Sequence, residues 1–208
     1  MFTINIYLRF ALMGLFILGG IVLSFVPGFG FLYALPFLLI GISLLVGYIL
    51  LGTVQSAAPM MQTNDFEGAD RRLNLTFFPN LLYSTNRAYY YMIKGSVELA
   101  RKNMAKSEEY LKMAEAIDVP SDNEKAMLQL QLANIAASKN NWKKAQIHYR
   151  AAKQLKVTEE AIKDQLKMFE KAINNRGQAN AAARMGKQGS QMMRQGLGKS
   201  KRRRPKMK

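Results

Sequence analysis

Two long apolar segments lie near the start of the chain. Residues 10–26 and 31–51 are rich in Leu, Ile, Val and Phe, and the Pro-Gly-Phe-Gly sequence at 27–30 is a turn signal. The second segment has 21 residues. A helix of that length spans roughly 31 Å, which matches a hydrocarbon core of about 30 Å. The pattern predicts a transmembrane helical hairpin.

Two other interpretations of these segments are a signal peptide followed by one span, and a buried hairpin in a soluble protein. Only Arg9 provides positive charge before the first segment, and no small-residue cleavage motif follows Val26. These features are unlike a signal peptide. A chain of 208 residues is too small to bury two helices that are apolar on all sides. The membrane hairpin is therefore the favoured interpretation.

Positively charged residues lie on one side of the predicted hairpin. Arg9 precedes it, Arg71, Arg72 and Arg87 follow it, and its turn carries no charge. Basic residues are retained on the cytoplasmic side of a membrane. We therefore expect two spans in the inner (cytoplasmic) membrane, with both termini in the cytoplasm.

Small residues at a spacing of four positions occur on both apolar segments. Gly20 and Ser24 lie on the first segment, and Ser43 and Gly47 lie on the second. This spacing lets helix backbones approach closely in a membrane. We expect these positions at the contact between the two helices.

The chain from residue 65 onward has the pattern of amphipathic helices, and this pattern repeats at a fixed interval, from position 65 to 103 and from 103 to 141. Each aligned column holds side chains of similar character. The columns are Asp65, Asn103 and Asn141; Phe66, Met104 and Trp142; Ala69, Ser107 and Ala145; Leu73, Leu111 and Tyr149; and Thr76, Ala114 and Ala152. Small residues let two helices cross closely, and the large residue fills the space between them. The columns therefore predict stacked helix pairs.

One further column places Gly95 and Ala133 in the first helix of their pairs, and Ala57 stands one repeat interval before Gly95. We therefore expect the second span to continue past Leu51 as the first helix of the first pair. Pro59 predicts a kink or an early end in this continuation. The alternative is a helical bundle without repeats, in which the alignment is accidental.

These columns resemble the tetratricopeptide repeat, a family of paired helices. The second helix in that family has a small, then a large, then another small residue. Residues 140–145, followed by Tyr149 and Ala152, match this pattern, and residues 102–114 match it again. The usual unit has about 34 residues, and the longer linker at 118–123 accommodates the additional residues here.

Helix-start signals agree with this division. Ser121 and Glu124 form a capping box, and Thr158 followed by two acids starts a last helix that ends near Ile173. We expect this last helix to cap the stack. The resemblance implies an α-solenoid over residues 57–173.

The first helices of the pairs line a concave groove in this family, and the groove binds peptides or partner helices. The resemblance places seven residues there: Tyr89, Met92, Ser96, Met127, Leu130, Asn134 and Ser138. Asn134 matches an Asn of the family's carboxylate clamp, but Leu130 stands where that clamp needs Lys. The apolar, Met-containing lining favours a helix or peptide partner. The alternative is that these side chains pack against the domain's own neighbours.

No catalytic, cofactor or metal site is expected. The chain has no cysteine and a single histidine, His148, which lies in a predicted helix. Thiol nucleophiles and thiolate metal sites are therefore excluded. The carboxylates are spaced as helix-surface ion pairs, for example Glu108 with Lys112. We expect a protein that is not an enzyme.

Residues 174–208 carry eleven basic residues and no acid. Five glycines between residues 177 and 198 disfavour a helix, and like charges repel, so a disordered tail is predicted. The candidate polyanion-binding residues are Arg184, Lys187, Arg194, Lys199, Lys201, Arg202, Arg203, Arg204, Lys206 and Lys208. Flexible arginine segments suit RNA, including the ribosome. Anionic lipid and a tail without a partner are the alternatives.

The sequence predicts an all-α protein with a transmembrane hairpin in residues 1–56, a tetratricopeptide-like solenoid in 57–173 and a disordered basic tail in 174–208. The net charge of +16 lies mostly in the tail and implies a polyanionic partner. We expect a membrane-anchored adaptor on the cytoplasmic face, whose repeats bind a protein and whose tail binds RNA near the insertion or secretion machinery. The alternative is a structural subunit of a membrane complex, whose tail only adheres to anionic lipid.

Overall fold

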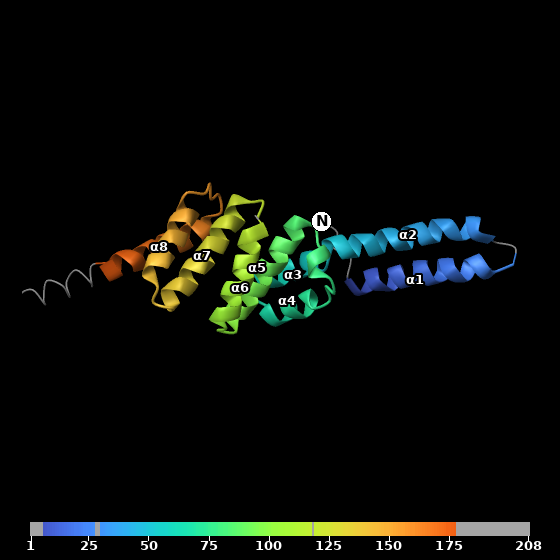
Figure 1. The fold of residues 1–208 in the computed structure, drawn as a ribbon, viewed down its shortest axis with the longest axis horizontal. Coiled ribbons are helices and arrows are strands. Elements are labelled where there is room, and N and C mark those ends of the chain that lie inside the picture. The colour runs from blue at the N-terminus through green and yellow to red at the C-terminus, as the bar shows by residue number, and fades with distance from the viewer. Residues whose placement is uncertain (1–5, 28–29, 118, 178–208) are drawn as a thin grey trace, which may run out of the picture. The chain divides into compact units, whose positions relative to one another are not determined.

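The computed structural model describes residues 6–27, 30–117 and 119–177, and all regular secondary structure in these ranges is helical. The described residues divide into two compact units, the first ending at residue 157 and the second beginning at residue 158. The helices of the first unit are α1 (Ile6–Phe25), α2 (Gly30–Leu51), α3 (Val54–Gln62), α4 (Phe66–Leu73), the 3₁₀ helix η1 (Pro79–Leu81), α5 (Ser84–Ala100), α6 (Met104–Ile117), α7 (Asp122–Ser138) and α8 (Trp142–Lys153) (Figure 1). The all-α fold class is confirmed for the part of the chain that is described.

The second unit contains a helix over residues 160–177. The sequence predicted a helix from Thr158 to about Ile173, followed by a disordered tail from residue 174. That boundary was wrong, because residues 174–176 do not interrupt a helix and the first glycine of the tail is Gly177. The cap function of this helix remains a prediction.

Helices α1 and α2 form an antiparallel hairpin, and both are long and apolar enough to cross a membrane. Glycines allow their close approach. A Cβ atom on Gly41 would lie 2.6 Å from Ile17 Cγ1, and one on Gly20 would lie 2.8 Å from Leu38 Cγ. The sequence correctly placed Gly20 at this contact, but it missed Gly41. Ser24 instead donates a hydrogen bond to the Ile21 carbonyl at 2.6 Å.

The sequence led us to expect that the second apolar helix would continue past Leu51 as the first helix of the first pair. The structure does not show this continuation. Helix α2 ends at Leu51, Gly52 follows with a φ of +61°, and α3 is a separate helix. Glycine adopts this left-handed backbone without steric cost. The expectation of a first helix packed on α4 is confirmed, because α3 packs against α4. Pro59 lies inside α3, and the helix continues beyond it to Gln62.

The remaining helices of the first unit form three antiparallel pairs, α3–α4, α5–α6 and α7–α8, and the three turns inside the pairs have the same geometry. Asn64, Lys102 and Asn140 have φ of 58°, 63° and 60°. The residue after each of them donates its backbone N–H to the carbonyl five positions earlier, at 2.8–2.9 Å. This is the Schellman arrangement of a helix end. The interval at which the sequence repeats is therefore also the interval at which the backbone structure repeats.

The two columns of small residues and the column of large residues between them are buried, whereas the columns that begin with Asp65 and Phe66 are exposed or partly covered. The small residues Ala69, Ser107 and Ala145 are fully covered, and so are Ala114, Ala152 and the large residues Leu73 and Leu111. Gly95 lets α5 approach α6 so closely that a Cβ atom there would lie 2.8 Å from Leu111 Cγ. The Ser107 hydroxyl donates to the Gly95 carbonyl at 2.7 Å. The small residues therefore mark the sites where helices cross.

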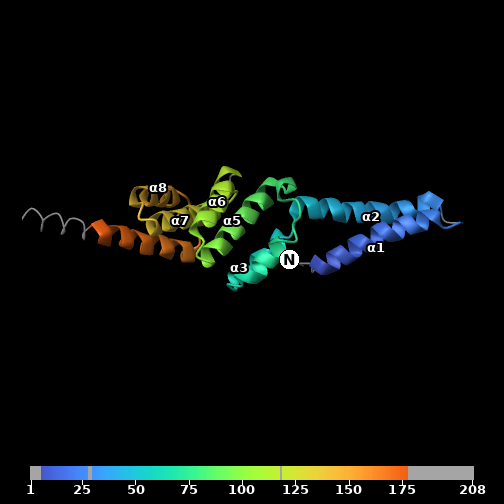
Figure 2. The same ribbon diagram turned by 60° about the horizontal axis from the view of Figure 1, so that its bottom comes forward.

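The first pair departs from the other two. Helix α4 has 8 residues, whereas α6 has 14 and α8 has 12. The chain between α4 and α5 contains η1 and returns to the end of α2 (Figure 2). Thr76, which replaces the alanine of the other pairs, is buried and lies 2.8 Å from the Thr53 hydroxyl. Thr76 therefore differs from the alanines of its column because its hydroxyl forms a hydrogen bond at the junction with the hairpin.

Candidate functional site

The predicted groove residues lie on α5 and α7, and they fall into two groups. Met92 and Leu130 are buried, so they belong to the interior and do not line an open surface. Tyr89 and Ser96 are partly covered. The exposed members are Met127, Asn134 and Ser138, all on α7. The available surface is therefore more polar than the sequence indicated.

Polar contacts connect α5 and α7 along this face. The Gln131 amide donates to Ser96 Oγ at 3.0 Å, and Ser96 Oγ donates to the Met92 carbonyl at the same distance. Burial and a hydrogen bond with Glu124 raise the pKa of the Tyr89 hydroxyl, which therefore stays neutral. The bonds of Gln131 with Ser96 and of Glu124 with Tyr89 therefore connect α7 to α5 along this face.

The hairpin is joined to the first pair by a network that the sequence did not predict. The Tyr48 hydroxyl donates to the Leu75 carbonyl. The Thr53 hydroxyl donates to the Arg72 carbonyl at 2.5 Å. The Asn86 amide donates to the Leu51 carbonyl at 2.8 Å, which satisfies an acceptor at the end of α2. The end of the hairpin is therefore hydrogen-bonded to α4, to the segment that follows α4, and to α5.

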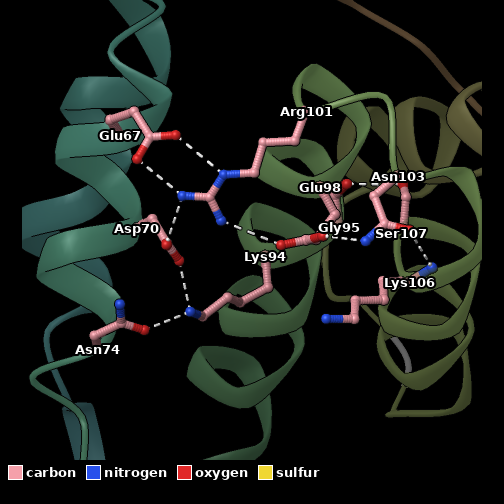
Figure 3. Close-up of polar contacts among 10 residues, drawn as sticks. All are labelled: Glu67, Asp70, Asn74, Lys94, Gly95, Glu98, Arg101, Asn103, Lys106 and Ser107. Atoms are coloured by element: carbon pink, nitrogen blue, oxygen red, sulfur yellow. Dashed lines mark hydrogen bonds and ion pairs between the residues drawn. The ribbon is translucent and has the colours of Figure 1, made fainter.

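Ion pairs connect the first pair to the second (Figure 3). Arg101, at the end of α5, donates to Glu67 and Asp70 of α4 at 2.9 Å each. Lys94 donates to the other oxygen of Asp70 at 2.6 Å. Burial raises the pKa of Asp70, but the hydrogen bonds from Lys94 and Arg101 outweigh it, so the pKa is lowered overall. Asp70 therefore stays ionised as the centre of this contact.

An equivalent ion pair recurs one repeat interval later. Glu108 corresponds to Asp70, and Lys139 corresponds to Arg101. Lys139 lies 2.5 Å from Glu108, and Lys144 and Lys112 lie within 2.9 Å of it. Hydrogen bonds from the three lysines hold the pKa of Glu108 well below its usual range. The sequence carries this signal, because an acidic residue recurs at positions 70 and 108 and a basic residue at positions 101 and 139, but these positions were not among the columns of the sequence analysis.

The single histidine and the acidic residues were also considered as metal ligands. Within residues 6–27, 30–117 and 119–177, no three His, Asp or Glu residues are grouped to hold a metal ion. His148 Nδ1 lies 2.7 Å from the Gln129 side-chain oxygen, which makes it the donor of a structural hydrogen bond. Burial lowers the pKa of His148, so its ring is neutral.

The ten predicted polyanion-binding residues, from Arg184 to Lys208, all lie outside the described residues. Their assignment continues to rest on the charge pattern of the sequence.

Comparisons with protein families, with curated proteins and with solved structures give no match. The likeness to the tetratricopeptide repeat therefore rests on the regular interval of the repeat and on the columns described above.

Proposed function

We propose that this protein is a membrane-anchored, non-enzymatic scaffold with tetratricopeptide-like repeats. The observation that supports it most is the repetition of the Schellman turns at Asn64, Lys102 and Asn140. Each turn closes one helix pair in the same way, and successive pairs are in contact through α4 with α5 and α6 with α7. Stacked pairs provide an extended surface for other proteins. The same compact unit contains two helices of membrane-spanning length and apolarity. A repeat array attached to a membrane presents a binding surface at a fixed place.

The proposed protein-binding surface follows α5 and α7. Met127, Asn134 and Ser138 are its exposed residues on α7, and Tyr89 and Ser96 border them on α5. A helix or peptide suits this surface, because a methionine side chain adapts to apolar groups while Asn and Ser provide hydrogen bonds.

The proposed partner of the tail is RNA, with the ribosome as the leading candidate. The segment from 199 to 208 has seven basic residues, of which three are consecutive arginines at 202–204. Arginine stacks on bases and binds phosphate through two parallel donors, whereas lysine acts as a point charge. A ribosome approaching the membrane presents RNA to a cytoplasmic tail of this kind.

The test uses the full chain in nanodiscs of neutral lipid, mixed with ribosomes and analysed by co-sedimentation. We expect the intact chain to co-sediment with ribosomes and a chain without residues 177–208 to remain in the supernatant. The matched variant replaces Arg202, Arg203 and Arg204 by Lys, which preserves charge and removes the planar guanidinium groups. Weaker co-sedimentation of that variant would support RNA recognition.

Unchanged co-sedimentation after deletion of the tail would refute its role in RNA binding. If the tail binds only to liposomes of anionic lipid, and the Lys variant binds to them as well as the intact chain does, the alternative of a structural membrane subunit is correct. Lipid adhesion depends on charge and is insensitive to the fork of the guanidinium group.

A further inference from the structure

The segment between α4 and α5 exposes a cluster of apolar side chains. Phe77, Phe78, Leu81 and Tyr83 each keep 56–69% of their surface exposed, although they lie within seven consecutive residues. The other exposed large apolar residues in 54–117 and 119–177 stand singly on separate helices: Met113, Met127, Ile147 and Met168. A concentrated apolar patch of this kind marks a surface that is covered in the functional state.

Hydrogen bonds fix this segment beside the last turn of α2. The Phe77 backbone N–H donates to the Tyr48 hydroxyl at 3.4 Å, and the Tyr83 backbone N–H donates to the Leu50 carbonyl at 2.8 Å. Leu82 packs so closely that a Cβ atom on Gly52 would lie 2.7 Å from it. Tyr48 stands one helical turn, about 5 Å, before the end of α2. The exposed patch is therefore held at the level where that helix reaches its end.

The same level has the composition of a membrane–water interface. No charged residue lies between Arg72 and Arg87. The Arg72 guanidinium lies 4.8 Å from the ring centre of Tyr7, and Tyr7, at the start of α1, is exposed. Aromatic side chains flanked by basic ones are typical of the headgroup region.

We propose that residues 77–83 insert into the headgroup region and the upper acyl chains of the bilayer that the hairpin crosses. The occupant of the patch is lipid, because the patch is hydrogen-bonded to the last turn of the apolar helix α2, where Leu50 is itself 46% exposed. This inference rests on the membrane crossing in the proposed function. It adds a second, shallow membrane contact, made by the repeat domain itself, which holds the first helix pair against the membrane surface.

The chain has no cysteine, so a single cysteine can be labelled cleanly. The experiment uses the full chain in phosphatidylcholine nanodiscs, with bimane attached to Phe78→Cys. Quenching is measured with a nitroxide-labelled phosphatidylcholine in the bilayer and with iodide in the water. The controls are Val22→Cys on α1 and Ile147→Cys on α8, because these residues are 63% and 66% exposed.

We expect bimane at position 78 to be quenched by the nitroxide lipid and protected from iodide, as at position 22. Position 147 should show the reverse. Iodide quenching at position 78 equal to that at position 147 would overturn the inference, and protection from both quenchers would overturn it as well, because the patch would then be covered by protein. Iodide quenching at position 22 would refute the membrane crossing itself, which separates a failure of the proposed function from a failure of this inference.

Discussion

Single charged side chains hold neighbouring helix pairs together. Asp70 and Glu108 are carboxylates on the second helices of two successive pairs, and each accepts hydrogen bonds from the end of the next first helix. An ion pair of this kind contributes substantially to folding stability only where it is shielded from water. The side chains of Asp70 and Glu108 are 12% and 15% exposed, so both contacts meet this condition in part.

Substitution of Glu108 by Gln should lower the stability of the first unit. The neutral amide gives up charge-assisted bonds to Lys139 and Lys144, and because both lysines are partly exposed the cost should be about 1–2 kcal/mol. Glu109→Gln, which removes one charge from an exposed neighbour, is the control and should change stability little. Urea unfolding of the full chain in mild detergent, followed by the fluorescence of Trp142, measures both. Equal stabilities of the two variants would contradict the assigned contact.

His148 should make stability depend on pH. Its folded-state pKa is lowered by burial from an ordinary value of 6.5, so the folded protein binds fewer protons than the unfolded chain just below that value. Stability should therefore be highest above pH 6.5 and fall as the pH decreases through it. The His148→Gln variant should flatten the dependence between about pH 7 and about pH 5, where carboxylates titrate little. An unaltered slope in this variant would show that another group is responsible.

At the scale of elements, the repeated unit is defined by its turns as much as by its helices. The turn residues Asn64, Lys102 and Asn140 adopt the left-handed conformation, which asparagine tolerates better than lysine. Lys102 is therefore the most strained of the three residues. The first and third pairs have less backbone strain at this position, because asparagine occupies it there.

Replacement of Lys102 by Gly should stabilise the first unit by roughly 0.5–1 kcal/mol, because glycine relieves the left-handed strain at some cost in chain entropy. The control is Lys143→Gly in the first turn of α8. There the same change should destabilise by up to ~1 kcal/mol, because glycine is a poor helix former. Opposite shifts in the thermal unfolding midpoint are expected. Shifts in the same direction would show that the turn is not as described.

The sequence predicted the helices and the columns well because both follow from hydrophobic period and residue size. The columns through Ala69 and Leu73 are buried throughout. The sequence analysis missed the break at Gly52 and the packing of Leu82 against it. Both depend on the segment after α4, which folds back to the end of α2, and no local sequence pattern indicates this path. For the candidate surface, Met92 and Leu130 were misplaced because a groove and an interior are both lined by apolar side chains.

At the scale of the whole molecule, the compact unit of residues 1–157 contains both the candidate spans and the helix pairs. Hydrogen bonds from Tyr83 and Asn86 reach the last carbonyls of α2. In the proposed membrane crossing, the helix pairs therefore fold on the side of the membrane that Leu51 reaches.

Both termini should lie in the cytoplasm, since every basic residue of the chain lies outside the segment from 10 to 70. A reporter that is active only in the cytoplasm, fused after Lys208, should give full signal, and a fusion at Gly28 in the hairpin turn should give none. A signal at Gly28 together with silence at Lys208 would invert the orientation and exclude a cytoplasmic RNA partner.

The hydrogen-bonded junction at Tyr48, Thr53 and Thr76 has a consequence for proteolysis. Helix α3 follows α2 after only two residues and is also the partner on which α4 packs. Release of the helix pairs by a cut within α3 would leave part of this helix attached to α2 and would open to water the side chains of Ala69 and Leu73, which pack with Val54 and Ala57 of α3. Shedding of an intact soluble form by a single cut within α3 is therefore incompatible with this fold.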